Sequence, residues 1–169
     1  MGREVRKVKP GWNHPLKDDA RPKMGYQPMF NESYQDACKQ WKEGLGQWEQ
    51  GRYEGRPRPQ DCEFWEWYGG PPDPQYYRPH WRPEEMTSYA VYETVSEGTP
   101  TTPAFQTKEE LVDYLVANGD YWDQERGDGG WDREAAEKFV GCGFAPSMMV
   151  SSSGIHSPRD KEMYAKEDD

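Results

Sequence analysis

Aromatic side chains replace aliphatic ones throughout this chain, and this substitution limits the core that it can build. The 169 residues include 24 Phe, Trp and Tyr but only five Leu and Ile. Leu, Ile, Val and Phe together number 18, about 11%, where a charged chain below roughly 20% is usually disordered. The 19 Trp and Tyr rings each bury roughly 150–250 Å² and keep a polar group. We therefore expect a thin, irregular core and strong binding surfaces, because Trp and Tyr are frequent at binding hot spots.

Charge and cysteine content narrow the class of protein. The net charge of −10 arises entirely from residues 86–169, whereas residues 1–25 carry a net charge of +4. No apolar run approaches the roughly 18 residues of a membrane span, and no apolar stretch follows the first residues, so we expect neither a membrane span nor a secretory signal. Three widely spaced cysteines favour reduced thiols in a cytoplasm over a disulfide framework: Cys38, Cys62 and Cys142.

The sequence predicts an α+β fold in which a small antiparallel sheet is accompanied by two or three helices and an extended Pro/aromatic-rich N-terminal region. Residues 1–30 are predicted to be an extended basic arm, because prolines recur every five to seven residues after position 9. Residues 31–85 are predicted to be a helix followed by a Pro/aromatic segment that wraps the core. Residues 86–150 are predicted to be a compact α+β unit, and residues 151–169 a flexible acidic tail.

The clearest helix is expected over residues 33–50. Ser33 and Asp36 resemble a capping box, and the apolar residues that follow are spaced by four, three, four and three. These residues are Tyr34, Cys38, Trp41, Leu45 and Trp48. The stripe faces either the protein's own core or a groove on a partner.

Residues 56–83 hold seven prolines interleaved with aromatic rings, which argues against a regular helix or a central strand. The segment is expected to be extended or polyproline-like with turns. Two interpretations remain open at this point. The rings either point inward as the segment wraps the core, or form an aromatic strip for a partner.

Within residues 86–150, helix and strand signals alternate. Tyr89–Val95 is rich in β-branched and aromatic residues and predicts a strand, and Thr102–Phe105 a short edge strand. Thr107 and Glu110 form a capping box for a helix that ends near residue 118. A second helix is expected from Asp132 to Val140 with Gly141 as its stop, and a last strand over Phe144–Val150.

Three segments of this region resemble small uncharacterised proteins of tailed bacteriophages. They are Tyr89–Pro100, Thr107–Leu111 and Gly143–Val150, and the opening Val5–Val8 with Trp12–Pro15 is similar to the start of such proteins. The resemblance covers about half of the chain. It implies a phage origin and expression in a bacterial cytoplasm, and it brings no assigned activity and no functional residues.

Metal and catalytic patterns are weak. The cysteines and histidines include no short knuckle of the kind that structural zinc sites use. A calcium loop counted from Asp123 fails because Asp128 occupies the sixth position, where an EF-hand needs Gly. Cys142 is the best nucleophile candidate but has no histidine nearby in the sequence. We therefore expect no cofactor, no metal and no enzymatic activity, with a small enzyme using Cys142 or the Asp128–Asp132 region as the least favoured alternative.

Charge suggests a partner of the opposite sign. Residues 109–137 hold ten acidic and two basic residues, so direct nucleic-acid binding is disfavoured. The acidic face either mimics a nucleic acid and docks on a basic protein site, or is simply solvated.

The leading hypothesis is a phage protein that inhibits or redirects a host protein by steric binding, with a possible anti-defence role. The alternative is a structural or assembly role in the phage particle. The predicted contact residues are five rings and four acids: Trp65, Trp67, Tyr76, Tyr77, Trp81, Asp120, Asp123, Asp128 and Asp132.

Overall fold

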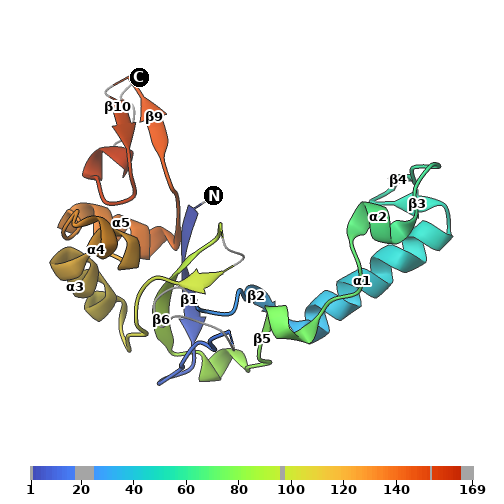
Figure 1. Cartoon of the computed structure of the whole chain (residues 1–169), viewed down its shortest axis with the longest axis horizontal. Coiled ribbons are helices and arrows are strands. Elements are labelled where there is room, and N and C mark those ends of the chain that lie inside the picture. The colour runs from blue at the N-terminus through green and yellow to red at the C-terminus, as the bar shows by residue number, and fades with distance from the viewer. Residues whose placement is uncertain (1, 18–24, 96–97, 153, 165–169) are drawn as a thin grey trace. The chain divides into compact units, whose positions relative to one another are not determined.

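A computed structural model describes residues 2–17, 25–95, 98–152 and 154–164. The chain divides into two compact units. One, the sheet unit, comprises Met1–Pro28 and Trp81–Asp169, and the other, the α1 unit, comprises Met29–His80. The fold is α+β, as the sequence predicts, and its main sheet is antiparallel (Figure 1).

The sheet unit is built on four antiparallel strands in the order β7-β6-β1-β8. Their bounds are Gly2–Val8 for β1, Ser88–Glu93 for β6, Thr99–Pro100 for β7 and Phe144–Pro146 for β8. In register, Arg3 of β1 lies opposite Glu93 of β6 and Ala145 of β8. The first strand of the chain is therefore an interior strand of its sheet.

The prediction of an extended basic arm over residues 1–30 is wrong for residues 2–8. The prolines begin only at Pro10, so nothing prevents β1 from pairing on both edges. Its arginines are tolerated because each has a carboxylate partner, Arg3 with Asp120 and Arg6 with Glu4. Residues 18–24 of the predicted arm lie outside the described residues.

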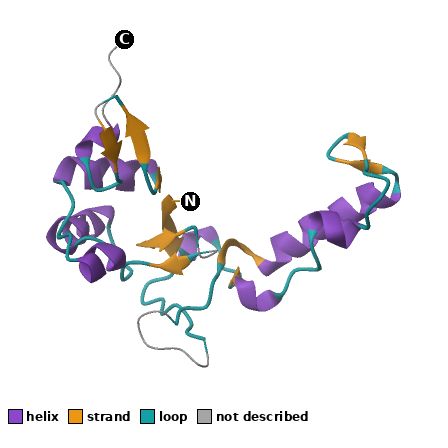
Figure 2. Cartoon of the chain, turned by 45° about the horizontal axis from the view of Figure 1, so that its top comes forward, coloured by secondary structure: helices purple, strands orange, loops and turns teal. Residues whose placement is uncertain are grey.

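Helices α3 (Lys108–Asn118), α4 (Tyr121–Arg126) and α5 (Arg133–Cys142) gather beside the sheet (Figures 1 and 2). The predicted capping box of α3 is confirmed, since Thr107 Oγ1 accepts from the Glu110 amide at 3.1 Å and Glu110 accepts from the Thr107 amide at 3.1 Å. Helix α5 ends two residues later than predicted, because Gly143 rather than Gly141 takes the left-handed conformation. Helix α4 was not predicted.

The sheet has a core on each of its faces, because successive side chains of a strand point to opposite sides. Val91 of β6 packs with α3 and α5 in a cluster that includes Leu111, Leu115 and Phe139. Its neighbours Ala90 and Tyr92 pack on the other face. The cluster on that face also contains Val8 and Trp81.

The end of the chain also belongs to this unit, so the prediction of a flexible tail is wrong for residues 151–164, apart from residue 153, which is not described. β9 (Met149–Ser151) pairs with β10 (Gly154–His156), and a short 3₁₀ helix follows at Lys161–Tyr164. Met163 is buried in the main core, which fixes this segment. The predicted strand Phe144–Val150 is divided between β8 and β9, and residues 165–169 lie outside the described part.

The edge of the sheet also differs from the prediction. β7 pairs with β6 at Thr99–Pro100, whereas Thr102–Phe105 forms no strand. Phe105 makes one isolated bridge to Tyr89. Pro103 lacks an amide hydrogen, which prevents a longer ladder at this edge.

The α1 unit is organised by one long helix, α1 (Tyr34–Glu49), as predicted. Ser33 caps it by accepting from the Asp36 amide at 3.2 Å. The other elements are β2 (Phe30–Ser33), β3 (Arg52–Tyr53), β4 (Arg56–Pro57), α2 (Phe64–Tyr68), a 3₁₀ turn (Pro74–Tyr76) and β5 (Tyr77–Arg78). β2 and β5 are parallel, and β3 and β4 form a hairpin.

The apolar stripe of α1 packs within its own unit. Trp41 and Trp48 lie 5.4 and 5.8 Å from the Phe64 ring, centroid to centroid. Phe64 and Trp48 are buried, and the Tyr68 ring stacks on Phe64 at 5.1 Å. The interpretation of the stripe as a core face is thereby supported, and the expectation that no helix forms within residues 56–83 is wrong at α2.

Replacing Gly46 with alanine is expected to stabilise α1 by about 0.5–1 kcal/mol, because Gly in a helix interior costs that much relative to Ala. Apart from the adjoining residues and the backbone of α1 itself, no described atom lies within 4 Å of the added methyl group. Hydrogen exchange of the α1 amides in the full chain measures the gain. Gly51→Ala is the matched control and should destabilise the unit, since Gly51 has a φ of 77°. A loss of protection in Gly46→Ala would contradict the prediction.

Candidate functional site

The most exposed large rings that the structure describes lie on α2. Trp65 and Trp67 are 62% and 53% exposed, and Tyr68 is 39% exposed. Both indoles are among the predicted contact residues. Together they form what we call the α2 indole surface, defined as Trp65 and Trp67. Large indoles left in water are unusual enough to mark a contact site when they are held in place.

Helix α2 is held firmly despite its length of five residues. Its first residue, Phe64, is buried against α1. A capping box closes its start, with the Glu63 amide donating to Glu66 at 2.8 Å. At its end the indole of Trp41 donates to the Gly69 carbonyl at 3.2 Å. The indoles are thus presented on a fixed backbone, which lowers the entropy lost on binding.

The β3–β4 hairpin supports one of the two indoles. Trp67 meets the Tyr53 ring edge-on at 6.2 Å, and Tyr53 meets Tyr68 in the same manner at 6.1 Å. The hairpin turns through two residues with positive φ, Glu54 at 46° and Gly55 at 75°. The support leaves more than half of the Trp67 surface exposed.

Charges beside the α2 indole surface are mainly acidic. Asp61, Glu63 and Glu66 are exposed and flank the indoles in the sequence. The α1 unit, residues 29–80, holds six Lys and Arg against nine Asp and Glu, a net charge of −3. Such a surface favours a partner that carries Lys or Arg, because these form ion pairs with carboxylates and cation–π contacts with indoles.

The remaining predicted rings are less available. Tyr76 and Tyr77 are half-buried, and Tyr77 packs against Phe30 at 5.2 Å and Tyr34 at 6.1 Å. Trp81 is only 7% exposed and belongs to the core of the sheet unit, so its prediction as a contact residue is wrong. Its ring meets Trp12 edge-on at 4.7 Å.

Two of the four predicted acids are also buried. Asp120 and Asp123 are 0% and 1% exposed, so the prediction that they face a partner is wrong. They form a reciprocal capping box at the start of α4, in which each carboxylate accepts from the other residue's amide at 3.0 Å. Two acids three residues apart in a sequence are consistent with either a helix cap of this kind or an acidic surface.

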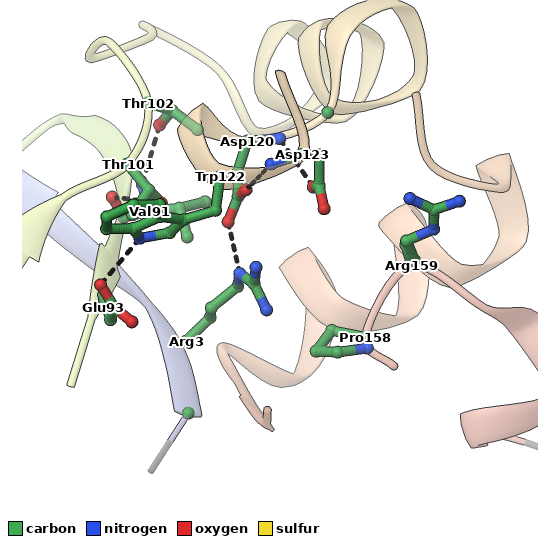
Figure 3. Close-up of polar contacts among 12 residues, drawn as sticks. Arg3, Val91, Glu93, Thr101, Thr102, Asp120, Trp122, Asp123, Pro158 and Arg159 are labelled. Atoms are coloured by element: carbon green, nitrogen blue, oxygen red, sulfur yellow. Dashed lines mark hydrogen bonds and ion pairs between the residues drawn. The ribbon is translucent and has the colours of Figure 1, made fainter. Parts of the chain in front are cut away.

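The buried acids join distant segments of the sheet unit, as Figure 3 shows for Arg3 and Asp120. Arg3 on β1 forms an ion pair with Asp120. Asp123 accepts from the indole of Trp131 at 2.6 Å and from Arg126 at 2.8 Å. Strand β1, helix α4 and the segment before α5 are therefore tied together through two carboxylates.

Burial and hydrogen bonding move the two acids in opposite directions. Burial raises the pKa of Asp120, against the pull of the Arg3 guanidinium. Burial also works to raise the pKa of Asp123, but hydrogen bonds from the Trp131 indole and the Asp120 amide outweigh it and hold that pKa below its usual range. Of these two coupled carboxylates, Asp123 therefore keeps its negative charge to a lower pH than Asp120 does.

A cavity of about 650 Å³ adjoins this cluster, and arginines and acids share its wall. Each guanidinium already has a carboxylate partner. Arg126 pairs with Asp123 and Asp128, and Arg159 pairs with Asp128 at 3.2 Å. Because the charges are satisfied within the wall, we interpret the cluster as an internal link and not as a docking site.

Exposed acids remain on α3, on α5 and in the segment before α5, but several of them form ion pairs with basic side chains or cap a helix. Asp128 and Asp132, the other two predicted acids, are exposed. Asp132 caps α5 by accepting from the Ala135 amide at 3.1 Å. Arg133 pairs with Asp113 at 2.7 Å and with Glu137 at 3.7 Å. The acidic face is therefore smaller than the ten residues of the sequence suggest.

Another pocket of the sheet unit lies around His14, and it was not predicted from the sequence. It measures about 670 Å³, and its described wall comes from residues 11–16, from Tyr26, from residues 100–104, from β6, and from α3 and α4. His14 donates from Nε2 to the Gln27 carbonyl at 2.6 Å, and Nδ1 lies 3.2 Å from the Tyr92 hydroxyl. No local pattern joins residues so far apart in sequence, so only the tertiary structure shows the pocket.

Within residues 2–17, 25–95, 98–152 and 154–164, no three His, Cys, Asp or Glu side chains are grouped so that they would hold a metal ion. In the same ranges no helix has both the length and the apolar character needed to cross a membrane. The cysteines Cys38, Cys62 and Cys142 are free.

Comparison with known proteins gives no relative: no family model, no curated protein and no solved structure matches this chain.

Proposed function

We propose that this chain is a phage-encoded, non-enzymatic binding protein that acts in the cytoplasm of the infected bacterium and inhibits or redirects a host protein with a basic surface. The observation that carries the proposal is the α2 indole surface, where two fixed indoles lie 62% and 53% exposed beside acidic side chains. Rigid aromatic anchors of this kind supply most of the energy of protein interfaces.

We assign the contact surface to the α1 unit because its two exposed indoles are flanked in the sequence by exposed acids. The buried residues Trp81, Asp120 and Asp123 have no part in it. The partner gains ion pairs with Asp61, Glu63 and Glu66 and ring contacts with the two indoles. Inhibition by this mechanism is steric, and it requires no chemical step.

A structural role in the phage particle rests on weaker ground. That role needs the basic arm predicted over residues 1–30 and the tail predicted over residues 151–169 to be free to wrap neighbouring subunits. The structure instead holds residues 2–8 inside a sheet and buries Met163 in the main core. The binding role is therefore the better supported of the two.

The double substitution Trp65→Ala with Trp67→Ala is expected to abolish capture of the partner from bacterial lysate, because truncating one hot-spot ring costs about 2 kcal/mol or more. The partner is identified by mass spectrometry, purified, and titrated against both proteins by calorimetry. At 1 M salt, where the Debye length is about 3 Å, the wild-type protein is expected to bind the partner more weakly than at low salt.

The matched control is Val150→Ala with Ile155→Ala, two side chains that are each 70% exposed on the β9–β10 hairpin. This variant should retain the partner. Equal binding by wild type and the indole variant, or equal loss in both variants, would overturn the placement of the site. Binding that survives 1 M salt unchanged would remove the acidic contribution.

A further inference from the structure

The pocket around His14 in the sheet unit is chemically unlike the rest of this protein. None of the sixteen described residues that line it is Asp, Glu, Lys or Arg, although these four types make up 31% of the chain. Its volume of about 670 Å³ lies within the 300–1,000 Å³ typical of small-molecule sites. The absence of charged side chains from the described part of this wall, in so charged a chain, favours an uncharged occupant.

His14 contributes no positive charge to this wall at neutral pH. Because Nε2 faces a carbonyl oxygen at 2.6 Å it carries the hydrogen, and Nδ1 accepts from the Tyr92 hydroxyl at 3.2 Å. Burial lowers the pKa of His14, and the nearby Arg6 lowers it further, although the hydrogen bond to Gln27 acts in the opposite direction. Arg6 lies over the Tyr92 ring at 4.4 Å and is paired with Glu4.

His14 is also the centre of a rigid aromatic floor. Its ring meets those of Trp12, Tyr26 and Tyr92 edge-on, at centroid distances of 6.3, 5.5 and 5.5 Å. Tyr92 is only 2% exposed, so it is part of the floor and not of the rim. Edge-on packing of this kind fixes the rings before any ligand arrives.

Four aromatic positions of the wall keep surface available. Trp12, Tyr26, Tyr114 and Tyr121 are all half-buried. Each is supported by another ring: Trp12 by Trp81 at 4.7 Å, Tyr26 by His14 at 5.5 Å, Tyr114 by Phe105 at 5.0 Å and Tyr121 by Trp122 at 5.0 Å. A half-buried, supported ring offers its remaining surface for stacking at little entropic cost.

Polar but uncharged groups complete the wall. Asn13 and Gln124 carry amides, each with two donors and an acceptor oxygen. Gln124 donates to the Tyr114 hydroxyl at 3.1 Å, which orients that ring. Amides beside aromatic rings match a planar heterocycle that has hydrogen-bonding edges, because the base stacks while its edge is bound.

We propose that this pocket binds an uncharged aromatic heterocycle of the nucleobase or nucleoside class. Phosphorylated forms are disfavoured, because the described residues of the wall include no cation that would compensate a phosphate group. The site is separate from the α2 indole surface, which belongs to the other unit, so each of the two proposals stands or fails without the other.

The test is calorimetry on the full chain with adenosine, guanosine, cytidine and uridine, each compared with its 5′-monophosphate. We expect at least one nucleoside to bind, and its monophosphate to bind at least tenfold more weakly. Tyr121→Ala and Tyr26→Ala are expected to weaken binding about tenfold, which is the effect of losing one base–aromatic stack. Tyr121→Phe, which keeps the ring, should bind as wild type does.

The matched control is the Trp65→Ala, Trp67→Ala variant, whose lost rings lie in the α1 unit and whose nucleoside affinity should be unchanged. Circular dichroism confirms that each variant is folded. The proposal is overturned if no nucleoside binds at millimolar concentration or if monophosphates bind as tightly. It is equally overturned if folded Tyr121→Ala and Tyr26→Ala both bind as wild type does.

Discussion

Replacing Asp120 with alanine is expected to lower the free energy of unfolding of the sheet unit by about 3–5 kcal/mol. The substitution leaves the Arg3 guanidinium, only 12% exposed, without the carboxylate that compensates its charge. It also removes the cap of α4, since Asp120 accepts from the Asp123 amide. Urea titration with hydrogen exchange of the β1 and α4 amides measures the loss in this unit alone.

The matched control for Asp120 is Asp113→Ala. Asp113 forms an ion pair with Arg133 in which both side chains are more than half exposed, so its removal should cost about 0–1 kcal/mol. The double substitution Arg3→Met with Asp120→Leu should recover most of the loss, because a buried ion pair is replaceable by apolar residues of similar volume. Equal effects of Asp113→Ala and Asp120→Ala would contradict the buried link.

Replacing Phe139 with alanine is expected to destabilise the sheet unit by about 3–5 kcal/mol, through lost burial and the cavity left behind. Phe139 is 0% exposed at the centre of the main core, and its ring lies 5.2 Å from that of Trp131. A core with so few aliphatic side chains has little else to fill the space. Urea unfolding followed by hydrogen exchange of the α5 amides gives the change in free energy.

Phe144→Ala serves as its control. This ring is 52% exposed on β8, so the same change in chemistry should cost about 0.5 kcal/mol or less. The two substitutions make the same chemical change, one at a buried ring of α5 and the other at an exposed ring of β8. A loss below about 1 kcal/mol for Phe139→Ala would show that the core relaxes around the cavity and that Phe139 is not its centre.

Local signals in the sequence were sufficient to predict the long helices α1 and α3. The predicted caps Ser33 and Thr107 each accept a hydrogen bond from the amide three residues later. The β-branched and aromatic run after Tyr89 forms most of β6, which ends at Glu93, before the predicted Val95. These elements depend on spacing and capping within a few residues, which is the information that a short window contains.

The position of β1 was beyond such reasoning. Seven residues with three basic side chains and only two valines show no apolar face, and Arg3 finds Asp120 117 residues away in the sequence. The same contact explains the error at Asp120, because an acid on an exposed face and an acid that neutralises a buried arginine look identical in sequence. The residues that surround an acid in the folded structure, and not its residue type, decide whether it is exposed or buried.

The exposure of individual rings was also not predictable. Phe64 and Trp65 are adjacent, yet they are 5% and 62% exposed. Because α2 is a helix and not an extended segment, its residues are distributed around an axis, and α1 covers only one side. The inward interpretation is supported for Phe64, whereas the interpretation of the segment as an aromatic strip for a partner stays a prediction for the exposed Trp65 and Trp67.

The interior position of β1 affects the order in which the parts of this protein fold. One edge of β1 pairs with residues 88–93, and the other pairs with Phe144–Pro146, so both partners lie far from it in the sequence. Closing such long loops is slow compared with forming local contacts. Meanwhile α1 and α2, whose contacts are within residues 29–80, complete their packing early. A folding chain is therefore expected to complete the local packing of α1 and α2 before the four-stranded sheet closes around β1.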